Sequence, residues 1–341
     1  MLTERQRMIL NAIVDDYIRS AEPVGSRSIS KRGGVGFSPA TIRNEMADLE
    51  ELGFLEQPHT SAGRVPSTKG YRYYVDHLVK LGEVSEHELE RIRHFLADKM
   101  NQMEQVIQHA ATILSNLTNY TSIVLGPETF NTSLKHFQLV PLNENTAVAI
   151  IVTNTGHVEN RTVSIPSGVD MSEIEKVTRI LNEKLVGVPF SRLRSRLYSE
   201  VGQELGRYVG HYEEFLDILG NVLIAGEQEH RVFVSGTSNM LVQPEFKDVE
   251  KVKTLLELFD EQPALIKLVS ATPGIQVKIG SENDHEAINN CSLITATYSI
   301  DGQSLGTIGI LGPTRMEYGK VISLLDVISK DVALLYGKWY K

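Results

Sequence analysis

The chain has 341 residues, 41 % of them hydrophobic, and a net charge of −9, which predicts two or three folded domains and excludes an intrinsically disordered protein. Its longest apolar run, Ala147 to Val152, is far too short to span a membrane, and residues 1–11 lack the apolar core of a signal peptide. We therefore expect a cytoplasmic protein, in which the single cysteine, Cys291, is a buried strand residue without a disulfide partner.

The charge is distributed unevenly along the chain. Residues 1–75 contain ten Lys and Arg against nine Asp and Glu, whereas residues 76–341 contain 24 against 34. Two windows without any acidic residue, 26–44 and 57–75, hold four and three basic residues. Such clustering in an acidic chain indicates a local surface that binds a polyanion.

Two helices are predicted near the N-terminus. Apolar residues at helical spacing predict a helix over 3–19, which begins with a capping box formed by Thr3 and Gln6. A short second helix is expected over about 27–31, with Ser26 as its N-cap.

The third predicted helix begins after Ser38, has Pro39 in its first turn and ends at Gly53. Its apolar stripe comprises Ile42, Met46 and Leu49. The other face of its first two turns is small, polar and cationic, and Arg and Asn side chains form paired hydrogen bonds with guanine and adenine edges. The candidate base-reading residues are Ala40, Thr41, Arg43 and Asn44.

A two-stranded hairpin is expected after this helix. Residues 54–56 resemble a short strand, and Gly63 is predicted to mark the turn, with Arg64 at its tip. Three helices followed by such a hairpin predict a winged helix-turn-helix over residues 1–75. The candidates for contacts with the DNA backbone or minor groove are Arg27, Lys31, Ser38, Thr60, Ser61, Arg64, Thr68, Lys69, Tyr71 and Arg72.

The tyrosines after the hairpin have two interpretations. Tyr71, Tyr73 and Tyr74 could stack on bases, but Tyr74 and Leu78 fit the packing stripe of a following helix. Packing is the favoured interpretation, with Tyr71 kept as a candidate phosphate donor.

The rest of the chain predicts an α+β architecture. Residues 86–117 fit one long helix, which either forms a dimer seam or packs along a sheet. The sequence Asp301-Gly302 signals a hairpin. Strands are expected at 122–125, 135–142, 147–153, 159–165, 231–235, 276–280, 292–300 and 304–311, and further helices at 172–185, 190–224, 249–259 and 315–336. A sheet interrupted by a mostly helical block indicates an insertion, placed at 166–226.

The chain shows no pattern of an enzyme or of a metal or cofactor site. Its ten histidines are scattered, without a Cys/His cluster or an HExxH motif. The glycines at 33–36 are not followed by the Lys-Ser or Lys-Thr of a phosphate-binding loop. We therefore expect no catalytic residues, no cofactor and no metal.

Three blocks of the sequence resemble the HrcA family of bacterial heat-inducible transcription repressors: PVGSRSISKR (23–32), FSPATIRNEMADLEELGFLEQPHTSAGRVPS (37–67) and TKGYRYYVDHL (68–78). The resemblance implies a winged helix-turn-helix at 1–75, a GAF-like domain at 76–165 and 227–341, and an inserted dimerising domain at 166–226. It further implies a homodimer that binds double-stranded DNA at an inverted-repeat operator, called CIRCE, upstream of chaperone operons. The GroE chaperonin is the other implied partner, because it maintains repressor activity that is lost during heat stress.

Three alternatives remain open at this stage: a regulator whose GAF-like domain senses a metabolite, an enzyme tethered to DNA, and an RNA-binding winged helix. For heat itself, we expect marginal stability or aggregation of the body of the protein, since the sequence shows no titratable or metal switch.

Overall fold

The structure is a computed structural model of the whole chain. It describes residues 2–59, 63–97, 103–126, 133–154, 156, 158–166, 168–225, 232–270, 273–300 and 303–339.

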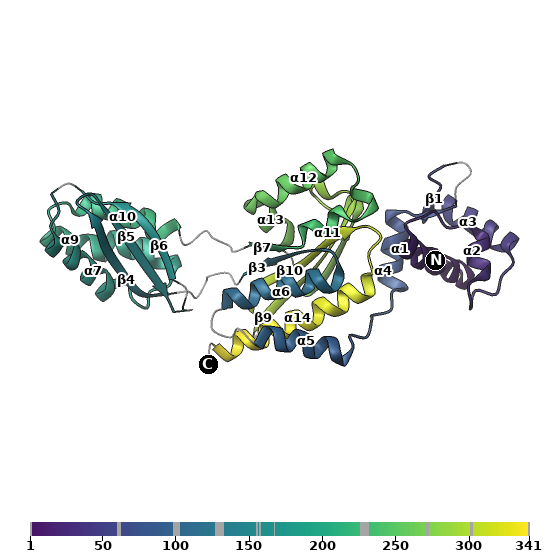
Figure 1. Cartoon of the computed structure of the whole chain (residues 1–341), viewed down its shortest axis with the longest axis horizontal. Coiled ribbons are helices and arrows are strands. Elements are labelled where there is room, and N and C mark those ends of the chain that lie inside the picture. The colour runs from purple at the N-terminus through teal and green to yellow at the C-terminus, as the bar shows by residue number, and fades with distance from the viewer. Residues whose placement is uncertain are drawn as a thin grey trace. The chain divides into compact units, whose positions relative to one another are not determined.

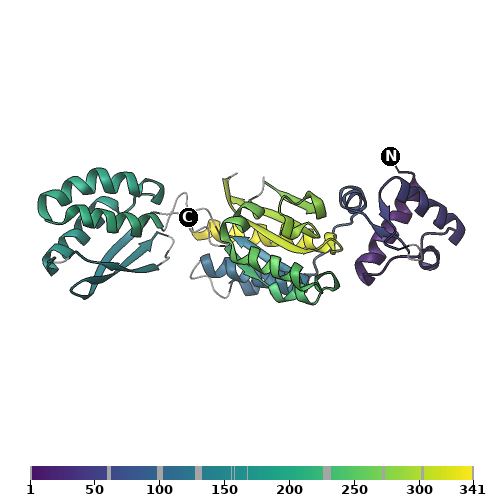
Figure 2. The same cartoon turned by 90° about the horizontal axis from the view of Figure 1, so that it is seen from above.

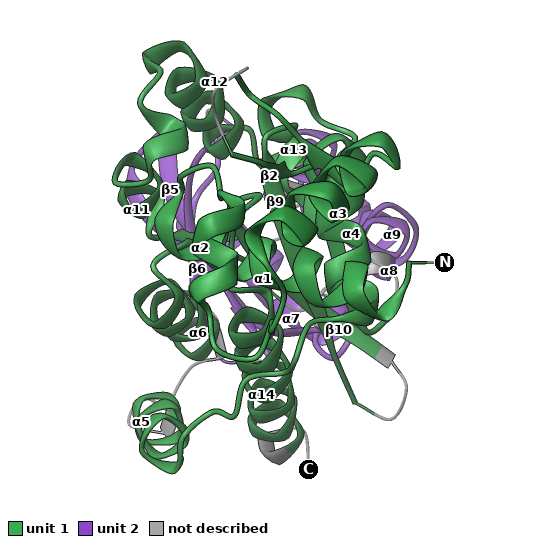
Figure 3. Cartoon of the chain, turned by 90° about the vertical axis from the view of Figure 1, so that its right-hand side faces the viewer, with its two compact units in different colours: residues 1–99, 104–126, 232–341 green, residues 100–103, 127–231 purple. Residues whose placement is uncertain are grey.

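The chain forms two compact units, which are coloured separately in Figure 3. The first comprises residues 1–99, 104–126 and 232–341, and the second comprises residues 127–231 together with 100–103. The first unit therefore contains both the N-terminal helices and the C-terminal third of the chain.

The N-terminal segment has the predicted three helices and short hairpin (Figure 1). The Thr3–Gln6 capping box and the cap by Ser38, whose Oγ accepts from the Thr41 N–H at 3.1 Å, are both confirmed. One cap differs from the prediction, because Gly25 is the N-cap of the second helix and Ser26 is its first helical residue. The elements are α1 (Glu4–Ser20), α2 (Ser26–Lys31), α3 (Pro39–Glu51), β1 (Leu55–Glu56), β2 (Val65–Pro66) and α4 (Thr68–His77).

Gly63 has a different role from the predicted turn. Its φ is not positive, and a Cβ at this position would overlap the carbonyl oxygen of Val24. The next residue, Arg64, exchanges two backbone hydrogen bonds of 2.9 Å with Val24, so this part of the hairpin lies against the segment between α1 and α2. The prediction that Arg64 lies at the tip of the wing is therefore wrong.

The C-terminal half of the first unit is built on a five-stranded antiparallel sheet in the order β7-β3-β10-β9-β8. Gln303 pairs with Ile300, as the predicted hairpin requires, although Asp301 and Gly302 lie outside the described residues. The strands are β3 (Thr121–Leu125), β7 (Val232–Ser235), β8 (Ile275–Ile279), β9 (Cys291–Ile300) and β10 (Gln303–Pro313).

Helices cover both faces of this sheet (Figures 1 and 2). On one face, Cys291 and Leu293 of β9 pack in a core shared with α11 (Thr237–Leu241), α12 (Val249–Asp260) and α13 (Gln262–Val269). The long helix α14 (Tyr318–Trp339) contacts β9 and β10. Cys291 is buried as expected, and burial raises the pKa of its thiol to about 12. The sheet and its helices confirm the α+β prediction.

The single helix predicted over 86–117 is wrong. The segment contains α5 (Glu86–Ala97) and α6 (Met103–Thr118), and the rings of Phe95 and His109 lie 5.1 Å apart. In one continuous helix these residues would be about 21 Å apart along the axis. The chain therefore reverses between α5 and α6, which apolar periodicity alone does not reveal.

The second unit contains strands as well as helices. A three-stranded antiparallel sheet, β4-β5-β6, is formed by β4 (Leu134–Asn143), β5 (Thr146–Thr153) and β6 (Val158–Ser164). Its helices are α7 (Met171–Leu185), α8 (Phe190–Arg196), α9 (Gly202–Tyr208) and α10 (Tyr212–Ala225), with a π-helical turn at Leu197–Val201 between α8 and α9.

The insertion therefore begins earlier in the chain than the predicted boundary at residue 166. The strands between 134 and 164 pair only with one another in the described residues, and the compact unit starts at residue 127. Their alternating pattern is the same whichever sheet they join, so the sequence does not reveal which partner they choose. Asn182 of α7 ties the helices to this sheet, because its side chain bonds both the N–H and the carbonyl of Phe137.

Candidate nucleic-acid interface

The predicted base-reading residues occupy the outer face of α3. Ala40, Arg43 and Asn44 are exposed, while Thr41 is half-buried and its hydroxyl lies 2.9 Å from that of Ser38. The opposite stripe of Ile42, Met46 and Leu49 is buried against the rest of the domain, as predicted. The helix is thus fixed by its apolar side and presents its polar side.

The cationic surface next to α3 comes from α2, which packs against it. Arg27 and Lys31 of α2 are exposed, and so is Ser38, the N-cap of α3. Because the N-terminus of a helix carries a partial positive charge, this corner favours phosphate. The remaining basic residue of the window, Arg32, instead forms ion pairs of 3.0 and 3.1 Å with Asp15 and Asp16 of α1.

The second basic window, 57–75, is occupied by internal contacts. Arg64 pairs with Glu50 at 2.7 Å and is only 19 % exposed. Lys69 is exposed, yet its Nζ donates to the Leu52 carbonyl at 2.7 Å and lies 4.6 Å from the centre of the Phe54 ring. These side chains stabilise the hairpin and the start of α4, so sequence clustering overstated the cationic surface.

Besides Tyr71, this window holds four other candidates for backbone contacts, of which two lie in described residues. Arg72 bonds Asp76 and Glu282, and Thr68 is half-buried near Gly280. Thr60 and Ser61 lie outside the described residues. Glu282 is not predictable as a partner of Arg72 from the sequence, since the two residues are 210 positions apart and no local pattern links them.

Tyr71 is not a surface residue, so its prediction as a phosphate donor is wrong. It is 2 % exposed, and its ring centre lies 6.0 Å from that of Tyr318. Burial raises the pKa of Tyr71, and its hydroxyl has no hydrogen-bond partner in the described residues. Tyr74 is 8 % exposed and donates to Asp15 Oδ1 at 2.9 Å. The packing interpretation is confirmed for both residues.

Comparison with known proteins identifies the family of the chain. Residues 1–77 match the family model described as winged helix-turn-helix transcription repressor, HrcA DNA-binding, and residues 104–322 match that of the HrcA protein C terminal domain. The chain belongs to the HrcA family. Members of this family are heat-inducible transcription repressors, and this chain is accordingly a repressor with a winged-helix DNA-binding domain and not an enzyme.

The similarity to heat-inducible transcription repressors extends over nearly the whole chain. The heat-inducible transcription repressor HrcA of Brevibacillus brevis is 54 % identical over 98 % of this chain and 97 % of its own length. That of Bacillus pumilus is 52 % identical over 100 % of this chain and 99 % of its own. A solved crystal structure of a hypothetical protein superposes with a TM-score of 0.71 at 26 % identity, covering 99 % of this chain and 100 % of that one.

Within the described ranges, no group of three or more His, Cys, Asp or Glu side chains is arranged to hold a metal ion. None of the described helices is both long enough and apolar enough to cross a membrane.

A matched pair of variants tests the assignment of the tyrosines. Tyr71→Phe removes a buried hydroxyl that has no hydrogen-bond partner among the described residues, so we expect the free energy of unfolding to stay unchanged or rise by up to about 1 kcal/mol. Tyr74→Phe breaks the hydrogen bond to Asp15 and should lower the free energy of unfolding by about 1 to 2 kcal/mol. Urea denaturation measures both values, and a loss of DNA affinity in the stable Tyr71→Phe protein would show that this hydroxyl contacts DNA after all.

Proposed function

We propose that this repressor binds, as a homodimer, an inverted-repeat operator of the CIRCE type upstream of chaperone genes, with α3 of each protomer in the major groove. The observation that carries the proposal is the division of α3 into a buried apolar stripe and an exposed polar face at its N-terminal end. A helix held in this way exposes side chains that match base edges, as recognition helices of helix-turn-helix proteins do. Binding at the promoter would block transcription sterically, in the cytoplasm.

The roles within the surface follow from side-chain chemistry. Arg43 and Asn44 are proposed to bond guanine and adenine edges, and Ala40 and Thr41 to contact apolar groups of the bases. Arg27, Lys31 and Ser38 are proposed to hold phosphates and so fix the register of α3. Of the basic residues in the window 57–75, Lys69 of α4 is exposed and retains the proposed phosphate role, whereas Arg64 is committed to Glu50.

Acidic residues at the other end of α3 support this orientation. Asp48 and Glu51 are exposed there, about two turns from Arg43, and would be repelled by the DNA backbone. The N-terminal end is therefore the end proposed to enter the groove.

Two substitutions separate base reading from backbone binding. Arg43→Ala should cost about 1 to 3 kcal/mol on the operator and reduce the preference for the contacted base pair. Arg27→Ala, the matched loss of an exposed arginine, should weaken all duplexes alike and reduce the slope of affinity against salt by about one unit. Fluorescence anisotropy with the operator, single-base variants and a scrambled duplex measures these effects. Unchanged base preference in Arg43→Ala would refute the base-reading assignment.

The homodimer is proposed to form through the sheet of the second unit. The inner face of this sheet, with Phe137, Ala149 and Val163, is buried in the core shared with the helices. On its other face, cross-strand neighbours pair Val140 with Val148 and Val152 with Val158. We define this outer face by Val140, Val148, Ile150, Val152 and Val158.

Exposure supports this assignment. Val140 is 37 % and Val158 is 54 % exposed, and the three central-strand residues between them are half-buried. The face also carries Gln138 and Asn160 on either side of Ile150, and exposed valines among such polar residues are typical of an interface. A second copy of the chain is the partner that fits a two-fold repressor on an inverted repeat.

A charge placed on the outer face tests the dimer. Ile150→Asp should raise the dimer dissociation constant at least about 100-fold, because burying an unpaired carboxylate costs several kcal/mol. Gln203→Asp adds the same charge at an exposed position of α9 and should leave the dimer intact. Light scattering after size-exclusion chromatography gives the masses, and a dimeric Ile150→Asp protein would exclude this face.

Heat inactivation is proposed to arise from unfolding or aggregation of the body of the repressor, opposed by the GroE chaperonin. The proposal is supported by the family resemblance, in which the chaperonin maintains active repressor. Purified repressor held at a heat-shock temperature should lose operator binding within minutes to hours, and chaperonin added during the incubation should prevent the loss. Full operator binding after prolonged heating without chaperonin would contradict this mechanism.

A further inference from the structure

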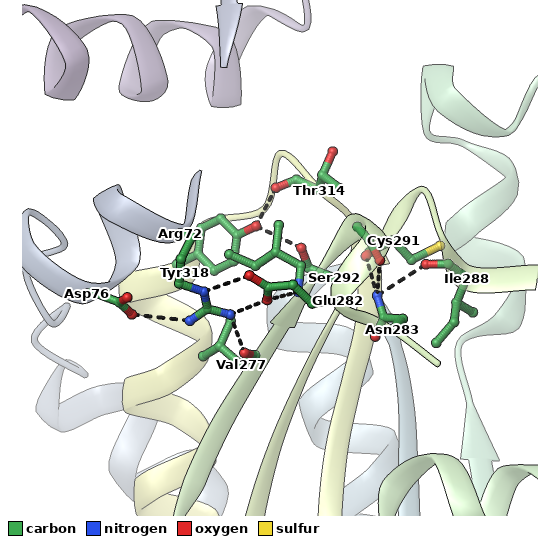
Figure 4. A network of polar contacts seen from close by, with 12 residues as sticks. Arg72, Asp76, Val277, Glu282, Asn283, Ile288, Cys291, Ser292, Thr314 and Tyr318 are labelled. Carbon is green, nitrogen blue, oxygen red and sulfur yellow. Dashed lines mark hydrogen bonds and ion pairs between the residues drawn. The ribbon is translucent and has the colours of Figure 1, made fainter. Parts of the chain in front are cut away.

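Arg72 of α4, a predicted DNA contact, is bonded instead to the part of the first unit that is built on the five-stranded sheet (Figure 4). We call this part the sheet domain. Its Nε donates to Glu282 Oε1 at 2.9 Å and its Nη2 to Glu282 Oε2. Nη2 also donates to the Val277 carbonyl, and Nη1 pairs with Asp76 at 3.1 Å. All three guanidinium nitrogens are therefore used, in the two-pronged geometry that makes Arg–carboxylate pairs strong and directional.

A second arginine makes the reciprocal contact. Arg315, which lies just before α14, is 11 % exposed and pairs with Glu245, while its Nη2 donates to Gln243 Oε1 at 2.9 Å. Its Nη1 donates to the carbonyl of Ile18 at 3.2 Å, near the end of α1. The last carbonyls of a helix lack partners within the helix, so this bond caps α1 with a side chain of the sheet domain.

Packing between these two arginines is close. The ring of Tyr318 lies 6.0 Å from that of Tyr71 and 6.4 Å from that of Tyr74, both in α4. The Tyr318 hydroxyl lies 2.7 Å from Ser292 Oγ, which holds the ring in place. At Gly280, a Cβ would approach Thr68 Oγ1 to 2.9 Å, so the start of α4 lies directly against the loop after β8.

Charge stabilises Glu282 in this position. Burial alone would raise the pKa of Glu282, but the hydrogen bonds from Arg72 and from the Ile279 N–H, at 2.9 Å, outweigh it and the pKa lies below its ordinary value. The carboxylate is therefore ionised at neutral pH, and it is fixed on both sides by donors.

We propose that Arg72 and Glu282 form an interdomain clamp that sets the position of the DNA-reading helix relative to the sheet domain, which makes Arg72 a positioning residue rather than a DNA contact. The inference rests on the proposed function. It follows from the place of α4, whose Tyr74 bonds Asp15 of α1 while Arg72 bonds the sheet domain. Because α1 in turn packs against α3, a shift at Glu282 would be passed to the base-reading face.

A fixed reading helix matters because an inverted repeat presents its half-sites at one spacing. Residues 78–85 connect α4 to α5. Without the clamp, the bond from Arg315 to Ile18 and the packing of Tyr318 would be left to orient the winged helix, which would then sample a wider range of orientations. Selecting the one that fits the operator would then lower the apparent affinity by the fraction of competent molecules.

The test is a double-mutant cycle with Arg72→Ala, Glu282→Ala and the double variant. The operator and two duplexes whose spacer is one base pair longer or shorter are the ligands, measured by fluorescence anisotropy. Arg196→Ala, which removes an arginine from an exposed pair with Glu200 at 2.9 Å, is the matched control. Thermal unfolding first shows that each variant folds, and Arg72→Lys, which keeps the charge but loses the two-pronged bond, replaces Arg72→Ala if that variant does not.

If the clamp acts as proposed, the operator affinity of both single variants and of the double variant falls by the same factor, about tenfold, which is a common size for coupling between sites. The affinity for the duplexes with altered spacers should change by less than about twofold. The ratio of operator affinity to altered-spacer affinity should therefore fall together with the operator affinity. If Arg72→Ala weakens operator binding while Glu282→Ala does not, the proposal is overturned. That result would mean that Arg72 contacts DNA directly and that Glu282 only competes with DNA for it, so that removing Glu282 strengthens binding. Unchanged or uniformly increased affinity in all variants would overturn the proposal too. If the wild-type protein itself fails to distinguish the operator from a scrambled duplex, the proposed function has failed instead.

Discussion

The two-pronged ion pair between Arg72 and Glu282 ties the winged helix to the five-stranded sheet within the first unit. It joins α4, the helix that follows the wing, to the loop after β8, across 210 positions of sequence. The same helix buries Tyr71 and Tyr74 between α1 and Tyr318, so polar and apolar contacts hold one element from both sides. The DNA-binding domain is therefore connected to the body by side-chain contacts as well as by the chain.

This arrangement divides the basic residues of the N-terminal domain into two groups. Arg64 and Arg72 satisfy acidic partners and hold the hairpin and α4 in place. Arg27, Lys31 and Arg43 are exposed around the first turns of α3. Local charge density identifies the domain as one that binds nucleic acid, but only the partner of each arginine decides which role it has.

The two faces of the three-stranded sheet in the second unit differ in their surroundings. One face of its three-stranded sheet is buried under α7 to α10, and the other carries β-branched residues on all three strands. Such a sheet packs one face into the core of the unit, and its other face is the one proposed to bind a second copy of the chain. Dimerisation through this face, as proposed above, would place the dimer contact and the DNA contact in different units of the chain.

The sequence by itself determined the local structure of the N-terminal helices and the division of α3 into a buried and an exposed face. The Thr3–Gln6 capping box, the Ser38 cap and the stripe of Ile42, Met46 and Leu49 depend on residues within a few positions, and all are present. The tertiary structure alone decided that α5 and α6 are separate, that β4 to β6 form their own sheet, and that Tyr71 and Arg72 face the body. The reason is that caps and periodicity are short-range properties, whereas the partner of a strand or of an arginine depends on which distant segment folding brings beside it.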